Sequence, residues 1–321
     1  MKLIAKSLLF AGLLFLGLNV SAQSVQDAGK LYNQANQQYK NRAYGQAVKL
    51  YEEALKTCKA AGPDAMELQS QVESQLAQAY FWNGISLYQK RQFDHAIAQF
   101  KKGANMAALI GNAKYKKLSR DYEARVYASK GNSLLLQKKY KEAAAQYDAG
   151  IKVYPNSINA YYGKCLLAKE LKNYSELKAM VAKVKSLIPT SRKGAQYYGK
   201  ARQVAFGAFL NAGASDLQKE NYKDALANFD QAKSYYDASG ILHYYMAVAN
   251  VKLKRWDTAI ANARKALTLQ VHSRSDVYFI LGQAYQGKGM KTQACASFKK
   301  VVKGPNVKSA KYQIKTVLKC K

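Results

Sequence analysis

The side chains most able to do chemistry in this 321-residue chain are three histidines, four cysteines and an excess of lysines. A catalytic histidine needs a nucleophile, a carboxylate or further metal ligands close by. His95, His243 and His272 are far apart in the sequence and form no recognisable catalytic group, and no cluster has the spacing of metal ligands. The segment Gly287-Lys288-Gly289 is expected to be a turn between helices and not a phosphate-binding loop. The sequence therefore predicts no enzyme activity, no cofactor and no metal site.

Lysine dominates the charge of the chain. There are 51 Lys and Arg residues against 20 Asp and Glu residues, which gives a formal net charge of +31 at pH 7. Only nine of the basic residues are arginines. Lysine is a hydrated point charge, whereas planar recognition of bases or phosphates through two hydrogen bonds usually uses arginine. The composition therefore favours diffuse attraction to lipid headgroups, an acidic wall polymer or an acidic protein, and it disfavours nucleic acid.

Two stretches of the chain concentrate this charge. Residues 177–215 contain seven basic and no acidic residues, and residues 277–321 contain ten lysines and no acidic residue. In the second stretch the lysines recur at helical spacing and predict one basic face, formed by Lys299, Lys300, Lys303, Lys308, Lys311 and Lys315. A solvated surface is the alternative, although solvated surfaces commonly mix both signs of charge.

The amino-terminal residues resemble an export signal. Lys2 and Lys6 precede an apolar run over residues 8–18. Val20-Ser21-Ala22 then supplies the small residues that a signal peptidase requires. We predict a signal peptide over residues 1–22. The alternative is a retained membrane anchor, but about a dozen apolar residues fall short of the ~20 needed to span a bilayer.

Cleavage after Ala22 would start the mature chain at Gln23 and, with two lysines lost, lower its net charge to +29. No transmembrane segment is expected after cleavage. The Ser-Ala-Gln ending of the signal looks bacterial. We therefore expect the periplasm or the cell surface of a Gram-negative bacterium.

The elements that position these side chains form an internal repeat. An aromatic residue is followed after two residues by a small residue, and after three more by an aromatic or bulky apolar residue. This pattern starts at Tyr44, Phe93, Tyr140, Tyr174, Tyr222, Trp256 and, in a degenerate copy, Lys291. The Tyr174 copy has Leu177 at the small position, and the Trp256 copy ends in Ala263. Twelve residues before the small residue of each copy lies another small residue, namely Ala35, Gly84, Gly131, Cys165, Gly213, Ala247 and Gly282. Because helices that cross closely need small residues at the contact, each copy predicts two helices joined by a turn.

This pattern resembles the tetratricopeptide repeat. Pro155 and Pro189 strengthen the resemblance, because they lie where that family ends a second helix and are 34 residues apart, the period of the family. The resemblance implies an all-α, right-handed superhelical solenoid of about seven helix-turn-helix repeats. The expected solenoid covers residues 23–305, with repeats near 28–61, 64–110, 113–157, 158–190, 191–239, 240–273 and 275–305.

Three repeats exceed the period of the family by 13 to 15 residues. The extra residues keep helical periodicity without an internal proline, which predicts lengthened first helices at Met66–Leu87, Ala113–Leu136 and Ser191–Leu217. Residues 306–321 are predicted to form a capping helix, with one apolar face made by Val307, Ala310, Ile314, Val317 and Leu318. A disordered basic tail is the alternative for this last segment.

The resemblance also implies where a partner would bind. In this family ligands usually lie in a concave groove lined by the first helices, at offsets of about two, five, nine and twelve residues. Those offsets give Tyr32, Asn36, Tyr39, Phe81, Tyr88, Arg125, Asn132, Tyr162, Lys169, Tyr244, Phe279 and Gln283. Such aromatic side chains with scattered amides would suit an extended peptide or a helix. The alternative is that the extra helical turns cover several of these residues.

A clamp for a C-terminal carboxylate is not expected. In the family such a clamp needs a lysine at offset five together with an asparagine at offset nine. Asn36 and Asn132 are present, but the offset-five residues of their repeats are Tyr32 and Ala128.

Three of the four cysteines have an expected place in these repeats. Cys165 replaces the small packing residue of one repeat and is expected to be buried. Cys295 lies on the last second helix, on the side that faces the predicted cap, and Cys320 lies on the cap. We predict a disulfide between Cys295 and Cys320, although sequence alone leaves the connectivity open. Cys58 has no assigned role.

Two kinds of binding function remain. The leading hypothesis is a non-catalytic scaffold or adaptor of the bacterial cell envelope that holds a protein partner in its concave groove. The alternative is binding of an anionic envelope polymer or lipid surface, such as peptidoglycan or lipopolysaccharide, through the lysines. An enzyme whose site is assembled across repeats has the least support, because no catalytic group of residues appears.

Overall fold

The computed structural model describes residues 23–321, and the predicted signal peptide lies outside these residues. Within them the chain is helical and has no strand, as the predicted all-α helical-repeat fold requires. Its internal contacts divide it into two units, one ending at Gly163 and the other beginning at Lys164.

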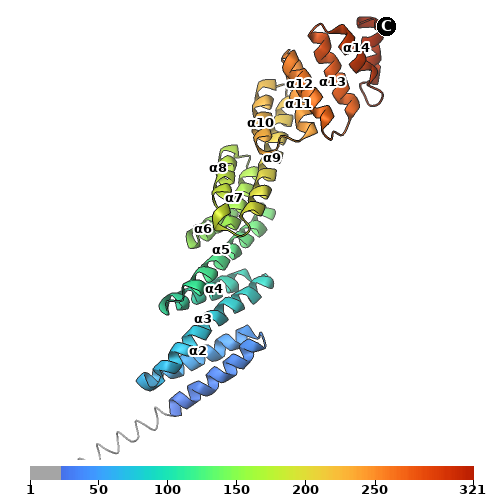
Figure 1. Cartoon of the computed structure of the whole chain (residues 1–321). Helices are drawn as coiled ribbons and strands as arrows, with labels where there is room; N and C mark the ends of the chain where they lie inside the picture. The colour runs from blue at the N-terminus through green and yellow to red at the C-terminus, as the bar shows by residue number, and fades with distance from the viewer. Residues whose placement is uncertain (1–22) are drawn as a thin grey trace, which may run out of the picture. The chain divides into compact units, whose positions relative to one another are not determined.

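Unit 1 contains a helix over residues 23–40 and then α2 (Tyr44–Ala61), the 3-10 turn η1 (Gly62–Ala65), α3 (Met66–Gln89), α4 (Phe93–Leu109), α5 (Ala113–Leu136), α6 (Tyr140–Val153) and the first part of α7 (Ile158–Glu170). Consecutive helices lie side by side as hairpins, blue to green in Figure 1. The first helices α3 and α5 also contact each other. Unit 1 is therefore a stack of helix pairs with the first helices in one layer.

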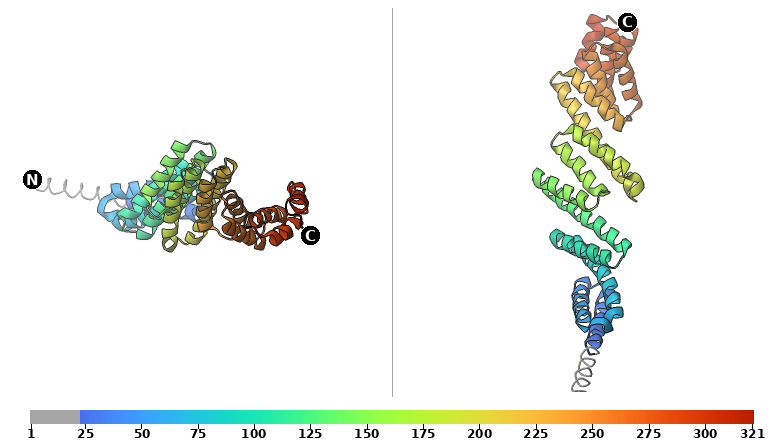
Figure 2. Two further views of the ribbon diagram at one scale, coloured as in Figure 1. Left: turned by 90° about the horizontal axis from the view of Figure 1, so that it is seen from above. Right: turned by 90° about the vertical axis from the view of Figure 1, so that its left-hand side faces the viewer.

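Unit 2 contains the rest of α7 and then α8 (Tyr174–Ser186), η2 (Ile188–Thr190), α9 (Gly194–Gln218), α10 (Tyr222–Tyr235), α11 (Gly240–Lys252), α12 (Trp256–Thr268), α13 (Arg274–Gly287), α14 (Lys291–Lys299), α15 (Val307–Tyr312) and the π-helical turn η3 (Gln313–Val317). The helices pair in the same way, yellow to red in Figure 2. The first helices again touch, α9 with α11 and α11 with α13.

The three lengthened first helices are confirmed. Helices α3, α5 and α9 have 24, 24 and 25 residues, whereas the ordinary first helices α11 and α13 have 13 and 14. Helix α9 begins at Gly194, three residues later than predicted, because Pro189 lies in the separate turn η2. A Cβ at Gly194 would lie 2.5 Å from the Cα of Ile188, so glycine permits this close start.

All seven hairpin turns share one backbone geometry. Five residues before the small residue of each second helix, φ is positive, at Arg42, Arg91, Lys138, Lys172, Glu220, Lys254 and Gly289. The next N–H donates to a carbonyl five residues earlier, for example Lys139 to Leu134 at 2.9 Å. This closure is the Schellman motif, which usually uses glycine. Since six turns use a charged residue instead, packing of the helix pair outweighs the local preference.

Glycines in the first helices receive aromatic rings from the second helices. A Cβ at Gly131 would lie 2.6 Å from the Tyr147 ring, and one at Gly213 would lie 2.5 Å from the Phe229 ring. Gly84 faces Phe100 and Gly282 faces Phe298 in the same way. All four rings are buried. The small residues that define the repeat therefore make room for these rings.

The residue that faces each buried ring depends on whether the ring carries a hydroxyl group. In the repeats with a buried tyrosine, the residue fifteen positions earlier is asparagine, and Tyr51 donates to Asn36 Oδ1 at 2.6 Å and Tyr147 to Asn132 Oδ1 at 2.8 Å. In the repeats with phenylalanine, that position holds Ile85, Ala214 and Gln283. A buried hydroxyl needs an acceptor and a phenyl ring does not, so the two positions change together along the chain.

The cap over the last repeat is present but differs from a regular helix. Ala310 is buried, and Val307, Ile314 and Leu318 pack against the core of α12, α13 and α14. Val317, predicted on the same face, is 46% exposed. That part of the prediction is wrong because η3 is a π-helical turn, whose wider spacing rotates Val317 away from the core.

Candidate partner-binding surfaces

A row of aromatic side chains crosses unit 1. We call it the aromatic row, and its members are Tyr39, Tyr44, Trp82, Phe81, Tyr115 and Tyr122. Neighbouring rings have centroids 5.3 to 6.0 Å apart. Trp82 stacks on Tyr44 with an interplanar angle of 21° and is 37% exposed. The row therefore presents an exposed indole on a base of packed rings.

The hydroxyl of Tyr39 lies at one end of this row. Burial, with Tyr115 and Tyr44 nearby, raises the pKa of Tyr39 to about 12. The hydroxyl is therefore protonated at neutral pH and can act as both donor and acceptor.

Phe81 is the covered member of this row and cannot meet a partner directly. It is 4% exposed, because Tyr115 and Tyr122 of α5 pack edge-on against its ring at 5.7 and 5.3 Å. Both tyrosines belong to the lengthened part of α5. The prediction of Phe81 as a groove contact is wrong for this reason, and the extra turns cover it.

The two predicted groove asparagines also serve the core. The side-chain oxygens of Asn36 and Asn132 accept the hydrogen bonds of Tyr51 and Tyr147 described above. Their amide groups can still donate to a partner.

The other predicted groove residues of unit 1 are half-buried. The ring of Tyr32 lies 6.0 Å from that of Tyr51, and the Tyr88 hydroxyl lies 2.7 Å from Ser129 Oγ. The Arg125 guanidinium donates to Asp121 at 2.6 Å and lies 4.5 Å from the Tyr122 ring. Arg125 therefore adds a cation beside the aromatic row. Tyr162, on α7, is also half-buried.

The predicted groove residues of unit 2 do not form a continuous row of ring contacts. Lys169 is exposed and pairs with Glu170 at 3.0 Å. Tyr244 and Gln283 are half-buried, and the Phe279 ring packs 5.7 Å from that of Phe298. Partner binding by these residues stays a prediction.

Trp82 is the residue that sequence reasoning missed. It lies next to Phe81, outside the four groove offsets, and so was not selected. It is one of only two tryptophans in the chain and does not occupy a repeat-defining position, unlike Trp256. Trp82 could have been identified from the sequence as a tryptophan that lies outside the pattern of core residues.

A hollow of about 430 Å³ lies over α5, on the side of α4 and α6, and is lined by Lys101, Arg120, Glu123, Tyr127 and Lys152 among others. Glu123 is only 3% exposed. Burial raises the pKa of Glu123, and the charges of Lys101 and Arg120 offset this only in part. The hollow therefore contains a carboxyl group that the folded state prefers to keep neutral.

This raised pKa predicts how a Glu123→Gln variant depends on pH. The folded state binds the proton of Glu123 more tightly than the unfolded state does, so its stabilising effect is full below the usual pKa of 4.5 and is lost as the pH rises through the folded value. Glu123→Gln should therefore be more stable than the parent chain at pH 7, with the difference vanishing below pH 4.5. Urea unfolding at both pH values measures this. Glu53→Gln, at an exposed carboxyl, is the control and should show no such gain.

A second hollow, of about 470 Å³, lies over α9 and is lined by Arg202, Phe206, Tyr235 and Tyr236 among others. The Arg202 guanidinium donates to the carbonyl oxygen of Tyr235. The rings of Phe206 and Tyr236 meet edge to face at 5.6 Å. The extended segment after α10 therefore forms one wall of this hollow.

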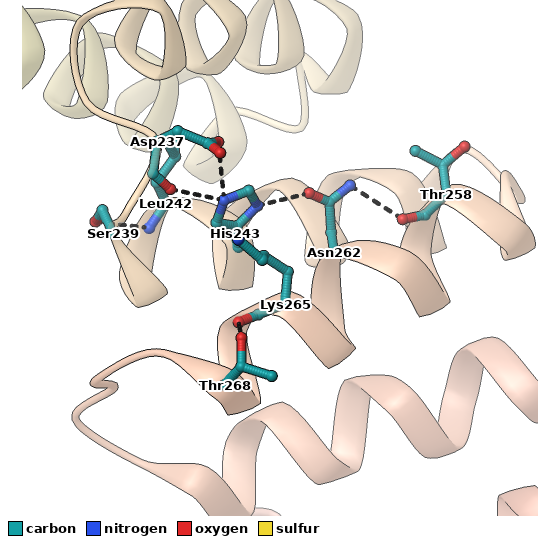
Figure 3. Close-up of polar contacts among 8 residues, drawn as sticks. All are labelled: Asp237, Ser239, Leu242, His243, Thr258, Asn262, Lys265 and Thr268. Carbon is teal, nitrogen blue, oxygen red and sulfur yellow. Dashed lines mark hydrogen bonds and ion pairs between the residues drawn. The ribbon is translucent and has the colours of Figure 1, made fainter.

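His243 contacts the segment after α10 through Asp237 (Figure 3). Its Nε2 lies 2.9 Å from the Asp237 carbonyl oxygen and 3.2 Å from the Asp237 carboxylate, and its Nδ1 lies 2.9 Å from Asn262 Oδ1. Asn262 in turn donates to the carbonyl of Thr258. Both ring nitrogens are thus engaged inside unit 2, so His243 is a structural residue that ties the α10–α11 connection to α12.

The predicted basic face is exposed in full. The side chains of Lys299, Lys300, Lys303, Lys308, Lys311 and Lys315 all lie at the surface. Beside them, Cys295 and Cys320 are joined by a disulfide with a Cα–Cα distance of 5.9 Å, the pairing predicted from their positions. Cys58 and Cys165 are buried free thiols, and burial raises the pKa of Cys165 to about 12.

Within residues 23–321, no helix is both long and apolar enough to cross a membrane. In the same range, no three His, Cys, Asp or Glu side chains gather closely enough to hold a metal ion.

Comparison with known proteins identifies one repeat directly. Residues 275–303, which contain most of α13 and all of α14, match the family model for the tetratricopeptide repeat. No curated protein matches the sequence.

Several solved structures have a similar helix arrangement. A tetratricopeptide repeat protein from Parabacteroides merdae ATCC 43184 is 16% identical, with 90% of this chain and 98% of that chain covered and a TM-score of 0.30. The TPR2AB domain of yeast Sti1, in a complex with pHSP90, is 15% identical, with 90% and 95% covered and a TM-score of 0.37. YrrB, described as a TPR protein with an unusual peptide-binding site, is 18% identical, with 60% and 88% covered and a TM-score of 0.33. The paired helices described above make the chain an all-α helical-repeat protein, and the family match identifies a tetratricopeptide repeat at residues 275–303.

Proposed function

We propose that this chain is a non-catalytic scaffold that binds a protein partner, with the aromatic row of unit 1 as its principal contact surface. The observation that carries this proposal is the exposed indole of Trp82 stacked on Tyr44. Large rigid rings bury much area at low entropic cost, which is why Trp, Tyr and Arg supply most of the binding free energy at protein interfaces. Tyr39 at one end of the row and Arg125 beside the other add polar groups that could orient the partner.

We further propose that the scaffold works in the bacterial envelope, after export directed by residues 1–22. Lys2, Lys6 and the apolar run that follows support this location. The disulfide between Cys295 and Cys320 also supports it, because disulfides persist in oxidising compartments.

A photo-crosslinking amino acid at position 82 tests the surface in living Gram-negative cells. Met66, which is 68% exposed at the start of the same helix α3, is the control position. We expect a crosslinked protein at position 82 that is absent at position 66. Trp82→Ala should then weaken binding of that purified partner at least ~10-fold, as expected for a central aromatic contact.

Equal crosslinking at both positions, or unchanged affinity of Trp82→Ala, would contradict the proposed surface. Amino-terminal sequencing of the chain from the same cells tests the location, and a start at Gln23 is expected. A chain that still carries residues 1–22 would contradict export by cleavage.

A further inference from the structure

The disulfide of unit 2 lies in a hollow walled by lysines. The hollow has a volume of about 440 Å³, and its charged lining residues are Lys291, Lys299, Lys319 and Lys321. Lys291, Cys295 and Lys299 are four residues apart along α14, so they share one face of that helix. The opposite wall is the segment Lys319-Cys320-Lys321.

The disulfide is the covalent link that holds these two walls together. One hydrogen bond joins the same walls, because Lys299 Nζ donates to the backbone oxygen of Lys321 at 2.6 Å. The Cys320 N–H donates instead to the carbonyl oxygen of Ile314 in η3, at 2.9 Å. Without the disulfide, residues 319–321 would keep few contacts with α14, and two of the four lysines would leave the hollow.

No acidic side chain lines the hollow together with the four lysines. Residues 277–321, which include its whole lining, contain no Asp or Glu. Four ammonium groups around one small space repel each other. A ligand with several negative charges would remove that repulsion, which distinguishes the hollow from an ordinary solvated surface of mixed charge.

We propose that this hollow binds a linear polyanion through its phosphate groups, and that the disulfide assembles the site. The cations of the lining are lysines, and a lysine binds a phosphate group as a point charge that can approach from any direction. The space has the size of a ligand site and is concave. A chain segment can enter it, whereas a flat bilayer would contact only its rim.

The test measures binding of inorganic polyphosphate to the full chain by fluorescence anisotropy. The variant Lys291→Gln/Lys319→Gln removes two charges from the hollow. The control Lys308→Gln/Lys311→Gln removes two exposed charges from α15, outside the hollow. The variant Cys295→Ser/Cys320→Ser keeps every charge and removes the disulfide. Circular dichroism checks that all variants remain helical.

We expect the hollow variant and the cysteine variant each to lose affinity about 10-fold, and the control pair to lose no more than ~2-fold. Equal losses in the two lysine pairs would show diffuse attraction and overturn the proposal. Unchanged binding by the cysteine variant would also overturn it. So would binding to vesicles of phosphatidylglycerol without binding to polyphosphate.

This site is independent of the aromatic row. Trp82→Ala should bind polyphosphate like the parent chain, so failure of one proposal leaves the other standing.

Discussion

Gly213→Ala is expected to lower the free energy of unfolding by about 2 kcal/mol, within the range for overpacking a close contact. The added Cβ would lie 2.5 Å from Phe229 Cε1 and 3.0 Å from the carbonyl oxygen of Ala225. Phe229 is fully buried, and the backbone of α10 cannot move away without opening the helix pair. The melting temperature and urea unfolding of the variant would measure the loss.

Gly207→Ala is the matched control, because Gly207 lies on the same helix α9 and has nothing within 4 Å of its added Cβ. This variant should gain about 0.5 to 1 kcal/mol, since alanine restricts the unfolded chain and favours the helix. If glycine to alanine lowers the free energy of unfolding at Gly213 and raises it at Gly207, the difference reports the packing against Phe229. If both variants shifted stability in the same direction, the close approach of Phe229 would not explain the effect of Gly213→Ala.

Asn132→Ile is expected to cost about 2 kcal/mol, because it leaves the buried hydroxyl of Tyr147 without its acceptor. Burial raises the pKa of Tyr147, because the ionised hydroxyl would lose its contact with water. Adding Tyr147→Phe should restore most of the loss, because the double variant copies the Ile85 and Phe100 pair already present in unit 1. A double-mutant cycle in urea should give a coupling free energy of about 1 to 2 kcal/mol.

The reverse experiment provides the control for this cycle. Ile85→Asn places an amide beside Phe100, which has no hydroxyl group to donate to it. We expect this variant to be less stable than the parent chain. No change at Tyr147 should restore that stability, because Tyr147 belongs to another helix pair. Additive effects of Asn132→Ile and Tyr147→Phe would instead mean that the hydrogen bond contributes nothing beyond the separate side chains.

The fold followed from the sequence because its determinants are short-range and repeated. The spacing between Gly131 and Ala143 fixes the length of a hairpin, and the same spacing recurs in every copy. The lengthened helices were predictable since helical periodicity continued through residues 113–136 without proline. Placing Cys295 on the last second helix and Cys320 on the cap suggested their pairing but left the connectivity open, and the structure contains this disulfide.

The candidate site was less predictable because it depends on contacts between repeats. The sequence showed that α5 is long but could not show that Tyr115 and Tyr122 lean onto Phe81. The offsets of an ordinary repeat therefore selected Phe81, which is covered, and passed over its exposed neighbour Trp82. Val317 was misplaced for a related reason, since a π-helical turn has no clear local signal in the sequence.

The match between each buried ring and the residue that faces it limits which segments of such a chain can be duplicated or exchanged during evolution. Tyr147 and Asn132 belong to different helices of one pair, and so do Phe100 and Ile85. Recombination that joined α3 to α6 would set a tyrosine hydroxyl against isoleucine, and the reciprocal product would leave an asparagine facing a phenyl ring. The first hybrid carries a buried hydroxyl group without an acceptor. The smallest segment that duplication can copy or exchange without this defect is the complete hairpin, so new repeats are viable when breakpoints fall between pairs and not within their turns.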